Sequence, residues 1–246
     1  SILIAAIFRP NHIYFKWYGR FMRKSLHKFS HIFVQDSSSQ ALVNDSGYGQ
    51  VSIAGDTRFD RVSRLSKHTE ALPKEIQEIL TAFSAEKPLF VGGSVWPEDM
   101  SILGVALEKT AHNIKFVLAP HKVDKASLET LLQVLPIQLQ KQSVWLSQTN
   151  PQEASEASVL IVDRIGILNQ VYPLAQMAYV GGGFKTGLHN TLEAAVYGIP
   201  LAIGPNFNKF KEAKDLVALG GIQVINTTEN ATQFLELVVE KPYIEQ

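Results

Sequence analysis

Short apolar runs alternate with amphipathic stretches along most of this 246-residue chain, and this alternation restricts the possible folds more than any other feature. The runs are nearly continuous in apolar residues, as expected of parallel strands that are buried on both faces. The stretches between them carry apolar residues at helical spacing. The pattern predicts an α/β fold, with a Rossmann-like parallel sheet and helices on both faces. We expect strands at residues 2–8, 31–35, 51–54, 89–92, 115–119, 159–162, 177–180 and 200–203, and helices at 15–29, 40–45, 74–83, 102–112, 126–134, 167–175, 188–197, 210–219 and 231–240.

A polar, charged segment at residues 61–73 interrupts this alternation. We place a domain boundary there, so that residues 1–64 and 65–246 form two Rossmann-like units. The opening run, residues 2–8, has the composition of a buried strand, which needs neighbouring strands. It follows neither an initiator methionine nor the basic region of a signal peptide. We therefore expect residues 1–64 to be the end of a larger domain that begins upstream.

Composition excludes several classes of function. Lys and Arg together number 23, as do Asp and Glu, so the overall charge gives no reason to expect a nucleic-acid partner. The absence of cysteine excludes disulfides, thiolate metal sites and cysteine nucleophiles. No apolar run approaches the ~18–20 residues that a membrane-spanning helix needs.

The loop most suited to binding a ligand is the glycine-rich segment 181–187, which follows the expected strand 177–180. Ligands of doubly wound folds bind beyond the carboxyl ends of the strands. Glycines allow the backbone to approach a ligand, and the start of the next helix offers N–H groups to a phosphate. The spacing matches neither the dinucleotide fingerprint nor a Walker A loop. The alternative is a tight strand-to-helix turn without a ligand.

The expected helix after this loop brings His189, Asn190 and Glu193 to one side. Gly198 and Pro200 limit its length. A carboxylate at position 193 is suited to accept hydrogen bonds from a ribose diol, whereas the alternative is a solvated helix face. For His189 the alternative is a capping or packing role.

Three further groups of polar residues have two interpretations each. Ser94 follows two glycines at a strand end, where it either binds an anion or caps the next helix. Asp56, Arg58 and Asp60, close to the boundary, either face a bound sugar or form ion pairs. An aromatic, basic stretch either touches anionic lipid or is half-buried in the first domain. That stretch contains Phe15, Lys16, Trp17 and Tyr18, followed by Arg20, Arg23, Lys24, His27 and Lys28.

The segment 187–195, Gly-Leu-His-Asn-Thr-Leu-Glu-Ala-Ala, follows the glycine triplet 181–183 and precedes Gly-Ile-Pro at 198–200. Together these segments resemble the Gly-His-Asn-x-x-Glu block of transferases of 3-deoxy-D-manno-octulosonic acid (Kdo). The similarity extends over nearly the whole chain. It includes Glu98 and residues 9–10, 15–19, 55–60, 93–94, 163–166, 204–206 and 210–213.

The resemblance implies a two-domain GT-B glycosyltransferase that transfers Kdo from CMP-Kdo to a lipid A precursor in lipopolysaccharide biosynthesis. It implies an inverting reaction without metal or cofactor, at the cytoplasmic face of the inner membrane, in a protein peripheral to or anchored at that membrane. The C-terminal domain then holds the donor, and an acidic general base lies in the N-terminal domain upstream of this chain. We therefore expect this chain alone to bind nucleotide without transferring sugar. The implied donor-binding residues are Ser94, His121, Lys122, Gly182, Gly183, Lys185, Gly187, His189, Asn190 and Glu193.

One position departs from the family pattern. The family commonly has Pro-Arg-His after the strand at 115–119, whereas this chain has Pro120 in place of the arginine, followed by His121 and Lys122. Lys122 offers a point charge in place of a bidentate guanidinium, or is an ordinary surface lysine. Two other functions stay open at this point. One is a nucleotide-sugar epimerase of the same fold, which would favour UDP, and the other is a nucleotide-binding module without catalysis.

Overall fold

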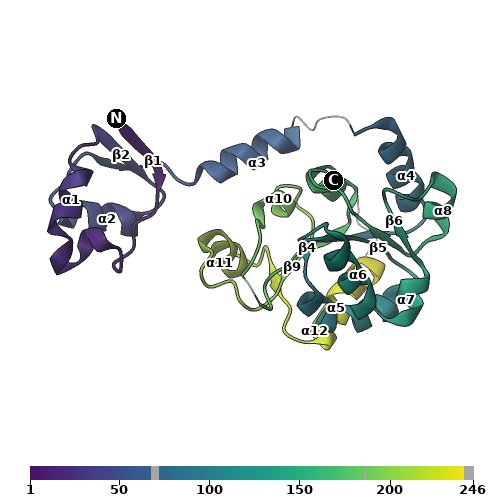
Figure 1. Cartoon of the computed structure of the whole chain (residues 1–246). Coiled ribbons are helices and arrows are strands. Elements are labelled where there is room, and N and C mark those ends of the chain that lie inside the picture. The colour runs from purple at the N-terminus through teal and green to yellow at the C-terminus, as the bar shows by residue number, and fades with distance from the viewer. Residues whose placement is uncertain (68–71, 186, 241–246) are drawn as a thin grey trace. The chain divides into compact units, whose positions relative to one another are not determined.

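The computed structural model describes residues 1–67, 72–185 and 187–240. The chain folds as two compact units, Ser1–Ser63 and Arg64–Gln246. The division lies beside the boundary predicted at residues 64 and 65. Figure 1 shows both units, which we describe separately.

The larger unit is built on one seven-stranded sheet in which all the neighbouring strands are parallel. The order across the sheet is β10-β9-β8-β4-β5-β7-β6. All the strands expected in this unit are present. The strands are β4 (Leu89–Val95), β5 (Lys115–Pro120), β6 (Ser143–Trp145), β7 (Val159–Ile161), β8 (Met177–Val180), β9 (Leu201–Ile203) and β10 (Gln223–Val224).

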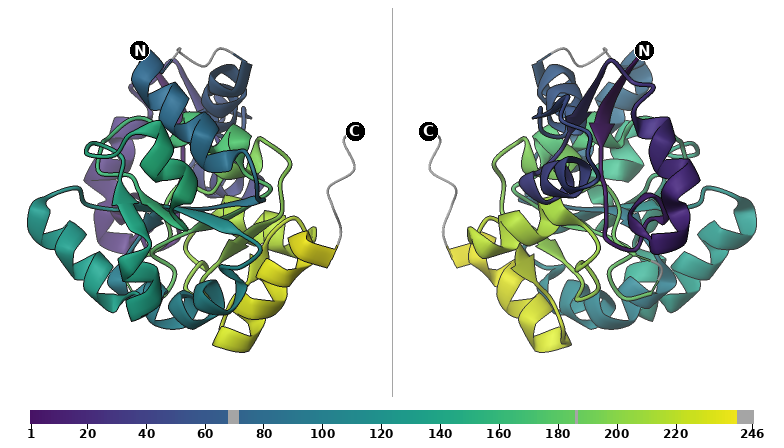
Figure 2. Two further views of the ribbon diagram at one scale, coloured as in Figure 1. Left: turned by 90° about the vertical axis from the view of Figure 1, so that its right-hand side faces the viewer. Right: turned by 90° about the vertical axis from the view of Figure 1, so that its left-hand side faces the viewer.

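Alternate residues of these strands belong to two separate apolar clusters, one on each face of the sheet. Val91 and Val117 pack with α4 (Lys74–Ser84), whereas Phe90 and Phe116 pack with α5 (Pro97–Thr110). A strand that supplies core residues to both faces has no polar side, which explains the continuous apolar runs. Figure 2 shows helices covering both faces, in agreement with the predicted fold class. The first cluster receives side chains from α4 (Lys74–Ser84), α8 (Pro151–Glu156), α9 (Leu168–Val171), α10 (Leu192–Ala195) and α11 (Lys211–Ala218), and the second from α5 (Pro97–Thr110), α6 (Lys125–Val134), α7 (Ile137–Lys141) and α12 (Thr228–Glu240).

The strand order reverses at β4. The next strand in the chain, β5, pairs with one edge of β4, and β8 returns to pair with its other edge. Crevices beyond the carboxyl ends of strands form at such a reversal. The loops after β4 and β8 therefore begin side by side. None of the helices within the described ranges is long and apolar enough to cross a bilayer.

The smaller unit has a three-stranded parallel sheet in the order β1-β2-β3. Its core is formed by apolar residues such as Phe8, Leu26 and Ile32. The sequence predicted that residues 2–8 form a buried strand, and this was wrong for the described residues. Ile2 is 61% exposed and Ile4 60%, since alternate side chains point to the same face of a strand and this face of β1 is largely uncovered within the described residues. The elements are β1 (Ile2–Ala6), α1 (Arg20–Leu26), β2 (His31–Val34), α2 (Ser37–Asp45), β3 (Val51–Ile53) and α3 (Thr57–Lys67), the last of which crosses the boundary between the units.

Other differences from the predicted elements concern short or polar segments. The helix expected at 15–29 is shorter, because two 3₁₀ turns, Ile13–Phe15 and Trp17–Gly19, precede α1. The helix expected at 188–197 is reduced to α10. The sequence did not predict β6, β10, α3, α7 or α8. Each of these except α3 has six residues or fewer, and α3 was hidden by its high content of charged residues.

Candidate functional site

The glycine loop after β8 is held against the protein by close backbone contacts. A Cβ atom at Gly181 would lie 2.4 Å from the carbonyl oxygen of Ser94, and one at Gly183 would lie 2.6 Å from the α-carbon of Gly204. Gly182 has φ +92°, and its carbonyl accepts the Gly187 N–H at 3.0 Å. The tight turn therefore requires glycine at these positions, as the alternative interpretation without a ligand predicted. The glycines also place this loop directly beside the end of β4.

Asp99, in the first turn of α5, connects the two loops. Its side chain is fully buried, and its Oδ2 accepts the backbone N–H of Trp96 at 2.8 Å and that of Gly182 at 3.0 Å. Its Oδ1 accepts the Tyr179 hydroxyl at 2.7 Å. Burial raises the pKa of the Asp99 carboxyl, although these three donors oppose the shift. Because one carboxylate links Trp96 and Gly182, the loops after β4 and β8 are fixed relative to each other.

Three aromatic rings stack at the junction of these loops with the end of β5. The ring centroids of Trp96 and His121 are 4.4 Å apart, and those of His121 and His189 are 4.2 Å apart. The Trp96 Nε1–H donates to His189 Nε2 at 3.2 Å. Burial, together with the charge of Lys122, lowers the pKa of His121. Burial, together with the charge of His121, lowers the pKa of His189, so both rings favour the neutral form.

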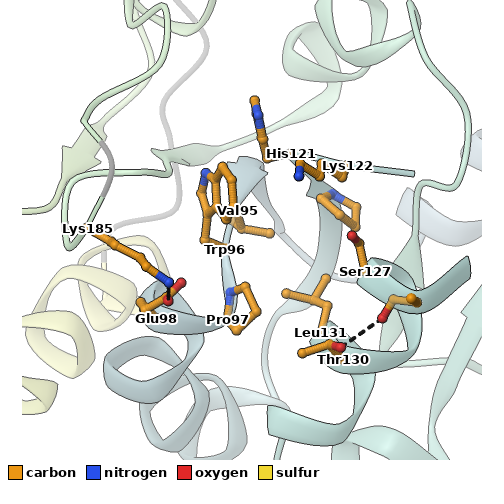
Figure 3. Close-up of a pocket in the computed structure, with 12 residues that line it drawn as sticks. Val95, Trp96, Pro97, Glu98, His121, Lys122, Ser127, Thr130, Leu131 and Lys185 are labelled. Atoms are coloured by element: carbon orange, nitrogen blue, oxygen red, sulfur yellow. Dashed lines mark hydrogen bonds and ion pairs between the residues drawn. The ribbon is translucent and has the colours of Figure 1, made fainter. Parts of the chain in front are cut away.

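A pocket of about 400 Å³ opens beside this stack (Figure 3). Trp96 and His121 form part of its wall, and Lys122 and Ser127 line the side towards α6. Lys185, from the glycine loop, points towards Glu98 on α5 and forms an ion pair with it. The hydrogen bond from Lys185 lowers the pKa of Glu98, although burial opposes the shift. The pocket thus combines an aromatic wall with cationic groups that suit an anion.

Asn190 and Glu193 meet as predicted, although not on one helix. Both His189 and Asn190 precede α10, so the predicted helical face was wrong. Asn190 Nδ2 donates to Glu193 Oε1 at 2.9 Å, and its Oδ1 accepts the Leu192 N–H at 3.3 Å. Among the described residues, Glu193 Oε2 accepts no hydrogen bond. The Asn190 amide therefore orients the carboxylate.

Within the larger unit, the structure brings most of the predicted site residues together. Ser94, with φ +51°, contacts the glycine loop, and His121, Lys122 and Lys185 reach the pocket. Asp56 and Arg58 lie in the smaller unit and pair with each other at 2.6 Å, which is the ion-pair alternative.

Trp96 and Asp99 were not among the residues predicted from the sequence. The available signal was an aromatic residue just after Gly-Gly-Ser-Val, with an acid three positions further on at the start of a helix.

Comparison with known proteins identifies relatives. No protein-family model matches the chain. It is 32% identical over 160 residues to the 3-deoxy-D-manno-octulosonic acid transferase of Aquifex aeolicus, a match that covers 63% of this chain and 43% of that protein. It is 28% identical over 221 residues to the Haemophilus influenzae enzyme of the same name, covering 87% of this chain and 49% of that protein. The chain therefore spans about half the length of these relatives.

The fold is similar to that of solved structures. The C-terminal CMP-Kdo binding domain of WaaA from Acinetobacter baumannii superposes with a TM-score of 0.57 at 16% identity, covering 75% of this chain and 90% of that one. A putative UDP-N-acetylglucosamine 2-epimerase from Listeria monocytogenes superposes with a TM-score of 0.60 at 10% identity, covering 98% of this chain and 60% of that one. These likenesses establish the fold alone. Over the half of those proteins that it spans, the chain is similar in sequence to 3-deoxy-D-manno-octulosonic acid transferases.

Proposed function

We propose that Arg64–Gln246 is the donor-binding unit of a Kdo transferase and binds CMP-Kdo without metal or cofactor. The observation that carries this proposal is the Asn190–Glu193 pair, oriented beside a glycine loop and a pocket with cationic walls. The sequence matches to Kdo transferases support the choice of nucleotide sugar.

We assign a part of the donor to each group of residues. Glu193 presents a carboxylate oxygen to the ribose hydroxyls, and a hydrogen bond to a charged acceptor contributes about 1.5–3 kcal/mol. The phosphate lies near the glycine loop and the two histidines. The adjoining pocket, with Lys122 and Lys185 on its wall, holds the sugar and its carboxylate. Positive charge at this place would also stabilise the phosphate as it departs.

Transfer requires more than donor binding. Inversion by direct displacement needs a base to accept the proton of the acceptor hydroxyl. We place this base, and the site for a lipid A precursor, in the part of the relatives that the chain does not span. The chain by itself then binds CMP and transfers no sugar.

The smaller unit supports attachment at the inner-membrane surface. Phe15 packs edge-on against Phe8, whereas Trp17 is 89% exposed and Phe21 83% exposed. Exposed aromatic rings next to basic residues favour the interface of an anionic bilayer. In the whole protein this surface would lie against the membrane that carries the acceptor.

Thermal unfolding with saturating CMP, UMP and ADP, each measured separately, tests the donor assignment. A ligand that binds the folded state stabilises it by mass action, so CMP should raise the melting temperature more than UMP or ADP. A larger shift with UMP would overturn the assignment and favour the epimerase. Equal shifts with all three would indicate a nucleotide-binding module without donor specificity.

A further inference from the structure

The two stacked histidines differ in their surroundings. His189 is partly buried between the glycine loop and Trp96, whereas His121, at the end of β5, is the more exposed of the two and has only its ring faces covered. They cannot easily carry charge together, because their ring centroids are 4.2 Å apart. A site that binds an anion through this pair must therefore give the two rings different roles.

The Trp96 indole determines the role of His189. An indole N–H only donates, so His189 Nε2, which receives it at 3.2 Å, must carry a lone pair. The neutral ring then has its proton on Nδ1. That N–H is a donor for an anion at any pH at which the protein is folded and the indole bond is intact. Protonation of Nε2 would break the indole bond, so the geometry disfavours a charged His189.

The same indole presents its face to His121. The two rings stack with an interplanar angle of 21°, and a tryptophan face attracts a cation. Lys122, on the same loop, disfavours charge on His121. Lys185, the other cation on the pocket wall, is paired with Glu98. Asp99 on α5 and Glu193 on α10 accept the hydrogen bonds described above. At α6, Asp124 accepts from Ser127, and Lys125 pairs with Glu129. An incoming anion would shift this balance towards the imidazolium form of His121.

We propose that Trp96 gives the two histidines different protonation states: its N–H holds His189 as a neutral Nδ1–H donor, and its ring face stabilises the His121 imidazolium that forms when a phosphate diester binds. The identity of the ligand rests on the proposed function. The protonation of His121 depends on that binding, whereas the tautomer of His189 does not. Trp96 is therefore a positioning residue, and binding of the phosphate takes up a proton from solvent.

Nitrogen-15 NMR of the histidine rings tests the first half without any ligand. At neutral pH His189 should be the Nδ1–H tautomer, which free histidine disfavours. Trp96→Phe keeps the aromatic face and removes the donor, so His189 should revert to the Nε2–H form. An Nε2–H tautomer in the unaltered chain, or a spectrum unchanged by the substitution, would overturn the proposal.

Calorimetry in buffers of different ionisation enthalpy tests the second half. The probe is the methyl ester of CMP, whose phosphate has a single charge that does not titrate near neutral pH. At pH values between the pKa of His121 in the free protein and its higher pKa in the complex, binding should take up close to one proton. Over this interval the affinity should fall by up to about tenfold for each unit by which the pH rises. His121→Gln should abolish the uptake, whereas His112→Gln, at an exposed turn, should leave it unchanged.

The NMR and calorimetry results test the histidine protonation states and the donor assignment separately. Failure of the ester and of CMP to bind would remove the donor assignment and with it the proposed protonation of His121, while the tautomer measurement still decides whether Trp96 fixes the tautomer of His189. Binding without proton uptake, or uptake that survives His121→Gln, would overturn the proposed protonation of His121 while the donor assignment stands.

Discussion

The two units differ in how they use apolar residues. In Arg64–Gln246 the strands supply side chains to clusters on both faces, and helices cover each cluster. In Ser1–Ser63 one small cluster forms the core, while Ile2, Trp17 and Phe21 remain largely exposed. The larger unit is therefore the one whose core supports the loops of the candidate site. The loops after β4 and β8 are fixed by a core that is covered on both sides, whereas the smaller unit presents apolar surface that is available for contacts.

The largest expected effect comes from a cavity in the core of the larger unit. Phe90 is fully buried, so Phe90→Ala should lower the free energy of unfolding of that unit by about 3–5 kcal/mol. Molecules in which the unit is unfolded should not bind CMP. The matched variant in the smaller unit is Trp17→Ala, at an 89% exposed position, which should change stability by no more than about 0.5 kcal/mol. Urea denaturation measures both. Comparable losses in the two variants would contradict the contrast between the units.

A smaller effect is expected from the glycine loop. A methyl group at Gly183 would meet the backbone of Gly204 at 2.6 Å, so Gly183→Ala should displace the loop and weaken CMP binding by about tenfold or more. Gly49→Ala in the smaller unit is the control, because a Cβ atom there meets nothing within 4 Å. Isothermal calorimetry with CMP would compare the two. Unchanged affinity in Gly183→Ala would mean that the nucleotide does not depend on this loop.

The same contrast explains what the sequence could predict. The strands of the larger unit were recognisable because burial on both faces leaves continuous apolar runs. The glycine loop and the Asn190–Glu193 pair were recognisable because their residues are close in sequence. Trp96 and Asp99 were missed because their partners, His189 and Gly182, lie far along the chain. The exposed face of β1 was missed because composition alone does not reveal which elements cover a strand.

The third prediction concerns the charge at the proposed ribose site. Glu193→Gln keeps the shape of the side chain and removes the charge, so CMP affinity should fall by about tenfold while the melting temperature without nucleotide stays nearly constant. Glu108→Gln, on an exposed position of α5, serves as the matched control for loss of a negative charge. Calorimetry that shows equal CMP affinity for the two variants would assign Glu193 to the solvated alternative.

The smallest expected effect lies in the ion pair of the smaller unit. Burial opposes the shift, but hydrogen bonds and charge from Arg58 hold the pKa of Asp56 below its usual value. A lowered pKa stabilises the fold above the unfolded value of about 3.9, and this stability is lost as pH falls through the folded value. Asp56→Asn should therefore lower the free energy of unfolding by less than about 1 kcal/mol at neutral pH, and by progressively less below about pH 4. Denaturation at several pH values should show that the unfolding free energies of the two proteins converge as the pH falls. A difference between them that grows in acid would contradict the lowered pKa of Asp56.

A structure of the chain with CMP bound tests most directly whether the loops after β4 and β8 form the donor site. We expect the ribose hydroxyls on Glu193 and the phosphate within hydrogen-bonding distance of the glycine loop and His189. A second pocket, of about 550 Å³ and lined by residues that include Trp145 and Asp163, provides the contrasting location. CMP bound there, with Glu193 and His189 untouched, would contradict a donor site at these loops.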